Sequence, residues 1–247
     1  TPESTYNNTD SIKVEDITIK NASLGHTGEI TMQTALNWSL NTGMVTVAQR
    51  LGNGSQITRG ARDTMYDYFY NRFRLGQKTG VDLPSESSGL YPNPEWKMRT
   101  RKAKWLKGET ISVSIGQGAF TATPIQLAMA ISIVSNHGYH LVPHVVSNTR
   151  GAKPFPVRNA PDGRVQFKGT DEDWSKMRDA MVDVINSGTG RGIRTNAYQI
   201  AGKTGTAQVK SIAQGKKYNE AILTERQLDH GLFVGFAPAE KPEIAIS

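Results

Sequence analysis

The sequence contains no cysteine and no long hydrophobic run, and both absences narrow the possibilities. Without cysteine among its 247 residues, the chain forms no disulfide and offers no thiolate ligand to a metal. Without a run of ~18 apolar residues, no segment is a candidate to span a bilayer. The length is enough for one large domain or two small ones, with a substantial hydrophobic core.

Acidic residues are too few to balance the basic ones, so the formal net charge is +7 and the pI is near 9.5. A basic segment interleaved with tryptophan can bind nucleic acid, but no nucleic-acid-binding fold motif accompanies the one in this chain. We interpret this basic segment as a solvated surface facing anionic lipid head groups or cell-wall polymer. It consists of Trp96, Lys97, Arg99, Arg101, Lys102, Lys104, Trp105 and Lys107.

The most informative motif is K-T-G-T at positions 203 to 206, which indicates acyl transfer on a peptide. It lies in a strand-like stretch, whose edge can receive an acyl substrate as an added strand. Gly205 leaves room for close backbone approach. Lys203 supplies a positive charge where an oxyanion and a substrate carboxylate would lie, and the hydroxyls of Thr204 and Thr206 can donate to that carboxylate.

A second motif, S-x-N, is formed by Ser39 and Asn41 on either side of Leu40. It lies between the apolar segment Ile30 to Trp38 and a predicted helix from Thr42 to Leu51, which Gly52 would end. A turn between two helices can direct both polar side chains into a cleft. S-x-N and K-T-G are two of the three motifs shared by β-lactamases and penicillin-binding proteins.

The third motif of that set, S-x-x-K with the nucleophilic serine, is missing, because no lysine has a serine three residues before it. Since the family order is S-x-x-K, S-x-N and K-T-G, we expect the nucleophile before Thr1. A second K-T-G, Lys78 to Gly80, follows Ser39 too closely and lies in a loop rich in glycine and proline. We therefore assign the active-site role to the copy that begins at Lys203.

Around these motifs the sequence resembles the transpeptidase domain of class B, monofunctional penicillin-binding proteins, nearest the elongation-specific type 2 protein of Gram-negative bacteria. One departure is Asn41, where type 2 proteins often have aspartate. The resemblance extends over nearly the whole chain. It is carried by the segments at 77–84, 95–97, 104–105, 108–111, 116–118, 121–126, 201–208 and 233–238.

The resemblance implies an α+β fold of the penicillin-binding protein and serine β-lactamase type, with an antiparallel sheet flanked by helices. It also implies that residues 1–247 are a partial transpeptidase domain. The nucleophile segment and a membrane anchor are expected upstream, and a closing segment is expected downstream. The implied location is the periplasmic face of the bacterial inner membrane.

The resemblance further implies a peptidoglycan D,D-transpeptidase, a cell-shape enzyme that cross-links stem peptides through a serine acyl-enzyme and is a target of β-lactams. Lys203 would stabilise negative charge and hold the lysine of S-x-x-K neutral, and the backbone N–H of Thr206 would complete the oxyanion hole. Ser39 would relay a proton to the leaving amine, while Asn41 would orient the substrate amide. Implied partners are a membrane glycan polymerase and elongation-complex proteins, and no cofactor, metal or nucleic acid is implied.

The residues alone leave open several functions other than transpeptidation. The site could belong to a D,D-carboxypeptidase or a β-lactamase-type hydrolase, since water and an acceptor amine compete for the same acyl-enzyme. The chain could also be a non-catalytic fragment or a basic binding module. Labelling of the full-length protein by a fluorescent penicillin would distinguish an enzyme from a non-catalytic fragment. An electrophoretic shift assay would test for a basic binding module.

The local patterns predict an α+β domain. One helix should run from the N-cap Thr123 to near Gly138, and another from about Thr170 to near Gly188. The second helix should bury a stripe of Trp174, Met177, Met181, Val182 and Ile185. Strands are predicted over Tyr198–Val209, Leu232–Ala237 and Glu243–Ser247.

Three smaller features complete the predictions. The polar segment Ser211 to Asp229 should be more mobile than the strands it joins. His137, His140 and His144 are interpreted as loop residues rather than zinc ligands, because Gly138 and Pro143 would break a shared helix. The Gly116-Gln117-Gly118 run should form a tight turn beside the cleft rather than a phosphate loop.

Overall fold

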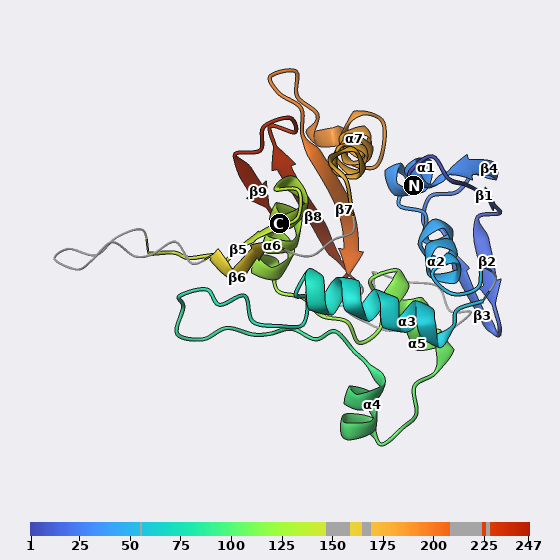
Figure 1. Ribbon diagram of the computed structural model, residues 1–247. Helices are drawn as coiled ribbons and strands as arrows, with labels where there is room; N and C mark the ends of the chain where they lie inside the picture. The colour runs from blue at the N-terminus through green and yellow to red at the C-terminus, as the bar shows by residue number, and fades with distance from the viewer. Residues whose placement is uncertain (55, 147–158, 165–168, 208–223, 226–227) are drawn as a thin grey trace.

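The α+β architecture predicted from the sequence is confirmed by the computed structural model (Figure 1). The structure describes residues 1–54, 56–146, 159–164, 169–207, 224–225 and 228–247. The α-helices are α1 Met32–Asn37, α2 Asn41–Arg50, α3 Arg59–Tyr66, α4 Pro94–Arg101, α5 Lys107–Ser114, α6 Pro124–Ser135 and α7 Asp171–Asn186. The strands are β1 Thr5–Asn8, β2 Ser11–Val14, β3 Ile17–Lys20, β4 Gly28–Thr31, β5 Tyr139–Leu141, β6 Asn159–Arg164, β7 Ala201–Ala207, β8 His230–Ala237 and β9 Ile244–Ile246.

The predicted late strands form a three-stranded antiparallel sheet in the order β7, β8, β9. Strand β7 begins at Ala201, later than the predicted start at Tyr198, which is 52% exposed. The last two residues of the predicted strand, 208 and 209, lie outside the described residues. Its register with β8 runs from Ala201 opposite Phe236 to Ala207 opposite His230. Within the described residues the other edge of β7 pairs with no strand, so an added strand could pair there.

Helices α6 and α7 pack on one face of this sheet. Thr123 caps α6 with Gln126 in a reciprocal capping box, and Thr170 caps α7 in the same way. Both predicted helix starts are confirmed. The sheet face they cover presents Ala201 and Phe236, which are buried together with side chains of both helices. The predicted stripe of α7 is too wide, since Met177 is 43% exposed.

The N-terminal part of the chain contains strands that the sequence patterns did not indicate. Strands β1 and β4 pair, as do β2 and β3, and each has only four residues. Such short segments carry too little alternation to be recognised. Their buried polar side chains set the start of α2: Asn8 accepts from the Thr42 hydroxyl at 2.8 Å, and Asn21 accepts from the Thr42 backbone N–H at 3.0 Å.

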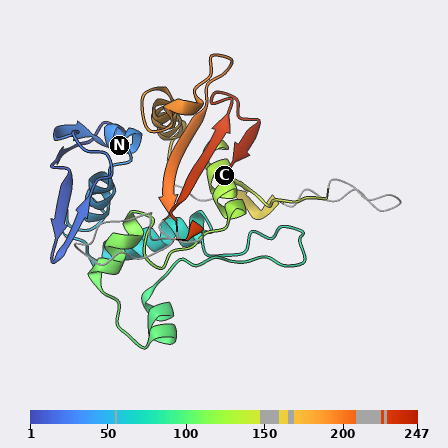
Figure 2. The ribbon, with the colours of Figure 1, turned by 180° about the vertical axis from the view of Figure 1, so that it is seen from behind.

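Helix α1 joins this N-terminal part to the sheet. Views from opposite sides place it beside α7 (Figures 1 and 2), and Gln33 of α1 donates a hydrogen bond to Asp183 of α7. A second core cluster lies between α2, α3 and α5. Helix α3 continues directly into a π-helical segment, Asp67–Arg72. Among the described helices none is both long and apolar enough to cross a membrane.

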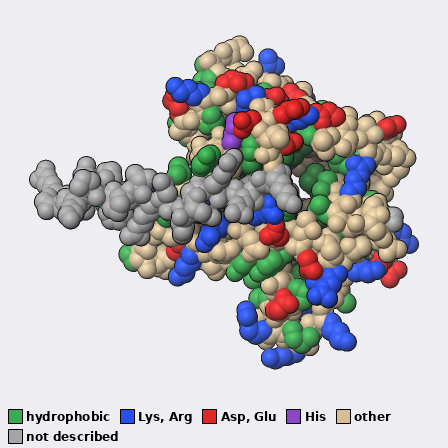
Figure 3. All heavy atoms as spheres, viewed as in Figure 1, with side chains coloured by type: hydrophobic (Ala, Val, Ile, Leu, Met, Phe, Trp, Pro, Cys, Tyr) green, Lys and Arg blue, Asp and Glu red, His purple; other side chains and the backbone are tan. Residues whose placement is uncertain are grey.

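The basic segment lies on and after α4, which projects from the molecule, and Lys and Arg side chains gather around it (Figure 3). Its interpretation as a fully solvated surface is wrong for Lys97, which is 7% exposed and ion-paired with Glu109 at 2.5 Å. Lys107 pairs with Glu15 at 2.5 Å. Burial of the Lys97 ammonium requires that partner, because an unpaired buried charge is costly.

Two further interpretations are affected by the structure. His140 is not a loop residue: it lies in β5, is buried, and its Nε2 contacts the Met129 sulfur at 3.0 Å. The segment predicted to be mobile, Ser211 to Asp229, lies mostly outside the described residues.

Candidate active site

The S-x-N and K-T-G motifs meet in space. The Nζ of Lys203 donates to the Oγ of Ser39 across 2.8 Å, although 164 residues separate them in sequence. The same ammonium donates to the carbonyl of Thr204 at 2.7 Å. The predicted convergence of Ser39 and Lys203 is confirmed, at slightly shorter range than the 3 to 6 Å expected from acid–base geometry.

Ser39 lies in the turn between α1 and α2, as the sequence predicted. Its φ is +54°, a left-handed conformation that costs a non-glycine residue about 1 to 3 kcal/mol. The turn is held by the N–H of Ser39 donating to Leu36 at 3.2 Å, and by the N–H of Leu40 donating to Ala35 at 2.8 Å. Leu40 is fully buried beneath the turn. The surroundings therefore fix the Ser39 hydroxyl toward Lys203.

Asn41 is the first residue of α2, so it shares this turn. Its side-chain N–H donates to the carbonyl of Lys20 at 2.9 Å, which ties the amide to the end of β3. The structure describes Asn41, Ser39 and Lys203, and it shows no hydrogen bond from the Asn41 side chain to either of the other two. The structure brings Asn41 to the site but leaves its amide oxygen as the group available to a ligand.

The electrostatics of Lys203 follow from its burial. Burial lowers the pKa of Lys203 to about 8, because its ammonium is partly removed from water. Its hydrogen-bond acceptors are a hydroxyl and a carbonyl rather than a carboxylate. The ammonium form is therefore the one present below about pH 8.

The rest of the K-T-G-T run presents two hydroxyls on one face of β7. Successive side chains of a strand point to opposite faces, so Thr204 and Thr206 share a face and Lys203 projects from the other. Gly205 and Thr206 are exposed. The side chain of Gln117 donates to the Thr206 carbonyl at 3.0 Å from a turn in which Gly116 and Gly118 have φ of +73° and +82°. The predicted tight turn is confirmed, and it contacts the strand that carries K-T-G-T.

Sequence reasoning missed one residue of this site, Thr189. Its hydroxyl lies 2.6 Å from that of Thr204, and its backbone N–H donates to the carbonyl of Asn37 at 3.0 Å. The available signal was a Gly-Thr-Gly sequence directly after a predicted helix, where a polar residue between glycines is placed by the turn rather than by a regular element.

The other K-T-G copy forms a closed loop. One carboxylate oxygen of Glu86 accepts from both the N–H and the hydroxyl of Thr79 at 2.6 Å, and the other accepts from the N–H of Gly80 at 3.1 Å. Burial acts against ionisation, yet these hydrogen bonds hold the pKa of Glu86 below its usual value. The Thr79 and Gly80 donors of this copy are therefore already bonded to the Glu86 carboxylate.

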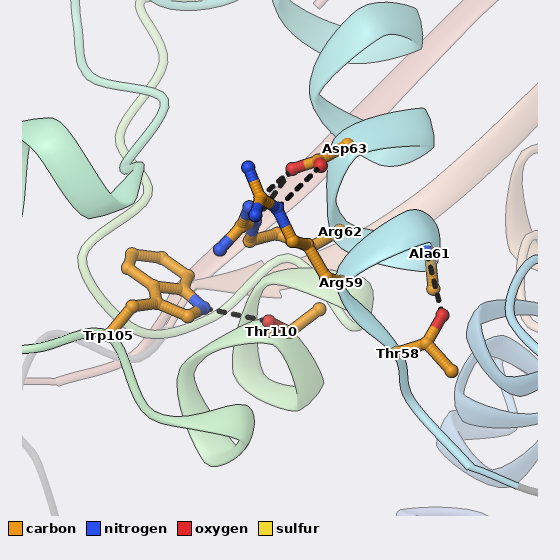
Figure 4. Close-up of polar contacts among 7 residues, drawn as sticks. All are labelled: Thr58, Arg59, Ala61, Arg62, Asp63, Trp105 and Thr110. Carbon is orange, nitrogen blue, oxygen red and sulfur yellow. Dashed lines mark hydrogen bonds and ion pairs between the residues drawn. The ribbon is translucent and has the colours of Figure 1, made fainter.

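A cavity of about 420 Å³ lies elsewhere, between α3 and α5 (Figure 4). Arg59 and Arg62 point to Asp63 on one side, and the Trp105 indole donates to Thr110 on the other. Its lining includes no residue of the S-x-N or K-T-G motifs, so it is separate from the site. Among the described side chains, no cluster of three or more His, Asp or Glu could hold a metal ion.

A strand carrying K-T-G-T, joined through its lysine to an S-x-N turn, combines two of the motifs shared by penicillin-binding proteins and serine β-lactamases. The chain belongs to the penicillin-binding protein transpeptidase domain family, whose model matches residues 1–247. It is 69% identical over 223 residues to the peptidoglycan D,D-transpeptidase MrdA of Acinetobacter baumannii, covering 90% of this chain and 32% of that protein.

Solved structures show the same likeness. The crystal structure of Pseudomonas aeruginosa PBP2 in complex with WCK 5153 matches with a TM-score of 0.79 at 33% identity, over 100% of this chain and 48% of that one. A peptidoglycan synthase complex that coordinates polymerization and crosslinking contains a chain that matches with a TM-score of 0.68 at 29% identity. That match covers 97% of this chain and 36% of the other. The chain thus spans about a third of its curated relative and less than half of these structures.

Proposed function

We propose that the protein containing this chain is a peptidoglycan D,D-transpeptidase that cross-links stem peptides through a serine acyl-enzyme. The observation that carries the proposal is the 2.8 Å contact between Ser39 and Lys203 at the open edge of β7. A peptide lying along that edge as an added strand would bring its scissile carbonyl to this pair. The likeness to the MrdA protein of A. baumannii supports the choice of substrate.

In the first half-reaction, a serine outside these 247 residues attacks the carbonyl carbon of the penultimate D-alanine. The neighbouring lysine of its S-x-x-K motif takes the serine proton. Ser39 relays that proton from the lysine to the nitrogen of the terminal D-alanine, the C–N bond breaks, and the amino acid leaves. In the second half-reaction, an amine of a neighbouring stem peptide attacks the ester carbonyl and gives up a proton to the lysine. The C–O bond to the serine breaks, and the lysine returns that proton to the serine oxygen.

The remaining groups act on charge and position. The Lys203 ammonium disfavours a second positive charge nearby, which keeps the base lysine neutral, and it stabilises the developing negative charge. The N–H of Thr206, together with that of the nucleophile, holds the oxyanion. The hydroxyls of Thr204 and Thr206 bind the substrate's terminal carboxylate, and the amide oxygen of Asn41 receives the substrate N–H.

The proposal extends to partners and location. A membrane glycan polymerase would supply the strands to be cross-linked, a role supported by the likeness to a chain of a synthase complex that couples polymerization to crosslinking. Other elongation-complex proteins, and a membrane anchor upstream, follow from the family resemblance. The site would face the periplasm, where the stem peptides are, and β-lactams would acylate the same serine.

Labelling by a fluorescent penicillin tests the proposal in the full-length protein. The wild-type protein should be labelled covalently, and Ser39→Ala should lower the second-order acylation rate by about 10² or more, since general acid–base groups contribute 10² to 10⁴. Ser135→Ala is the matched control, because in the described part of the chain that hydroxyl bonds only within α6, to the Ser132 carbonyl. An unlabelled wild-type protein, or equal rates for the two variants, would contradict the proposal.

A second assay separates transfer from hydrolysis. With a pentapeptide donor and a D-amino acid acceptor, mass spectrometry should detect the exchanged peptide amide. Release of only the free carboxylic acid would indicate a D,D-carboxypeptidase instead.

A further inference from the structure

Thr189 occupies the junction between the two halves of the candidate site. One half is the α1–α2 turn with Ser39, and the other is β7 with Lys203. The N–H of Thr189 donates to Asn37, two residues before Ser39, at 3.0 Å. Its hydroxyl meets that of Thr204, the residue after Lys203, at 2.6 Å. One exposed residue therefore links both halves through two different groups.

The two glycines beside Thr189 fit this junction and leave no space for a side chain. A Cβ on Gly188 would lie 2.4 Å from the Asn37 carbonyl oxygen, and one on Gly190 would lie 2.6 Å from the Ile185 side chain. The N–H of Gly190 also donates to Val184 at 3.0 Å at the end of α7. Close backbone approach on both sides holds Thr189 in place.

The hydroxyl pair has a fixed proton count. Two hydroxyls hold two protons, and their mutual hydrogen bond uses one of them. Whichever residue is the donor, one O–H remains free on the face of β7 that also carries Thr206. If Thr189 donates to Thr204, the Thr204 proton points outward, which is the arrangement needed to donate to an anionic group.

We propose that Thr189 is a positioning residue of the acylation reaction. It fixes the Thr204 hydroxyl so that its proton is directed to the carboxylate of the substrate or β-lactam, and it ties that strand to the Ser39 turn. The identity of the ligand in this proposal rests on the proposed function. The contact between the Thr189 and Thr204 hydroxyls is independent of that function.

The test uses full-length protein and separates ligand binding from the acylation step by stopped-flow kinetics with a carboxylate-bearing penicillin. Thr189→Val keeps the shape and the backbone N–H but removes the hydroxyl. It should weaken the non-covalent binding constant about tenfold or more, as for loss of a hydrogen bond to a charged group, and change the acylation rate constant much less. Thr189→Ser should restore binding to within about threefold.

Thr195→Val is the matched control, since among the residues that the structure describes its hydroxyl accepts only from the nearby N–H of Ala197, in the same connection between α7 and β7. Wild-type binding in Thr189→Val, or a Thr189→Ser variant as impaired as Thr189→Val, would overturn the proposal.

A thermal-melting cycle keeps this test independent of the proposed function, because it needs no ligand. The double variant, Thr189→Val with Thr204→Val, should have a smaller decrease in melting temperature than the sum of the decreases in the two single variants. The reason is that each single substitution already removes the same contact. Additive losses would overturn the link even in a protein that takes up no penicillin. An unlabelled wild-type protein with a coupled pair would reject only the substrate assignment and, with it, the role of Thr189 in acylation.

Discussion

At the scale of single residues, Lys203 determines how the proposed site depends on charge. Its ammonium donates to Ser39 and to the Thr204 carbonyl, neither of which is an anion. Burial is therefore not compensated by an ion pair, and it lowers the pKa of Lys203 to about 8. The residue is positively charged at neutral pH and becomes neutral just above it.

Replacing Lys203 tests whether its role is electrostatic. Lys203→Arg keeps the charge with a different geometry, so it should retain far more penicillin acylation than Lys203→Ala. Removal of an oxyanion-stabilising group costs about 10²- to 10³-fold in rate, or about 2.7 to 4 kcal/mol. Second-order acylation rates of both variants measure this. Abolished acylation in both would mean that Lys203 itself transfers a proton.

The pH dependence gives a second test of the same charge. Lys203 is protonated below its pKa of about 8 and deprotonated above it, so the stabilising charge is present at lower pH and lost as the pH rises through 8. Acylation by the wild-type protein should fall above about pH 8. Lys203→Arg should lack this decline, because arginine stays charged. An identical alkaline limb in both proteins would assign it to another group.

At the scale of elements, β7 combines a packed glycine with an open one. A Cβ on Gly202 would lie 2.4 Å from the Phe233 ring of β8. Of the described residues, a Cβ on Gly205 would meet only Leu232, at an ordinary 3.5 Å. Both glycines belong to the same strand, but only the first is required by the packing of the sheet. The second faces solvent, where a ligand backbone would approach.

Alanine at these two positions should separate folding from binding. Gly202→Ala should destabilise the protein by about 1 to 3 kcal/mol through overpacking. Gly205→Ala should change stability by no more than about 0.5 kcal/mol but slow penicillin acylation, since a methyl group would project at the strand edge. Thermal melting and acylation rates measure the two effects. Equal melting temperatures for both variants would show that the Phe233 ring moves aside freely.

At the scale of the whole molecule, the net charge is +7, but the basic segment offers fewer unpaired cations to a partner than its sequence suggested. In the basic segment, Lys97 and Lys107 are neutralised by Glu109 and Glu15. The Arg101 guanidinium lies over the Trp96 ring, 5.3 Å from its centre. The remaining cations surround α4 on a projecting element (Figure 3).

We accordingly expect no defined complex with nucleic acid. Phosphate contacts lose affinity steeply with salt, so duplex DNA should show at most diffuse retardation at low salt and none at about 0.15 M. An electrophoretic shift assay over a salt series tests this, with Arg99→Glu as the charge-reduced comparison. A discrete band that persists at 0.15 M in the wild-type protein and is lost in Arg99→Glu would reveal a nucleic-acid site.

The sequence by itself determined those features that depend on neighbours along the chain. Thr123 and Thr170 identified helix starts, because a capping side chain bonds to backbone only three residues away. The strand around Lys203 and the S-x-N turn were recognisable for the same reason. The short strands β1 to β4 were not, since four residues contain too little pattern, and their pairing depends on distant partners.

Only the tertiary structure decided which helices, strands and turns come into contact and how those contacts change the properties of single side chains. It set the contact between Ser39 and Lys203, the lowered pKa of that lysine and the burial of Lys97 beside Glu109. It also placed Thr189 against Thr204, although nothing in the sequence connected them. Each of these properties depends on groups from segments far apart in sequence, whose separation and exposure to water are fixed only when the helices and strands pack together.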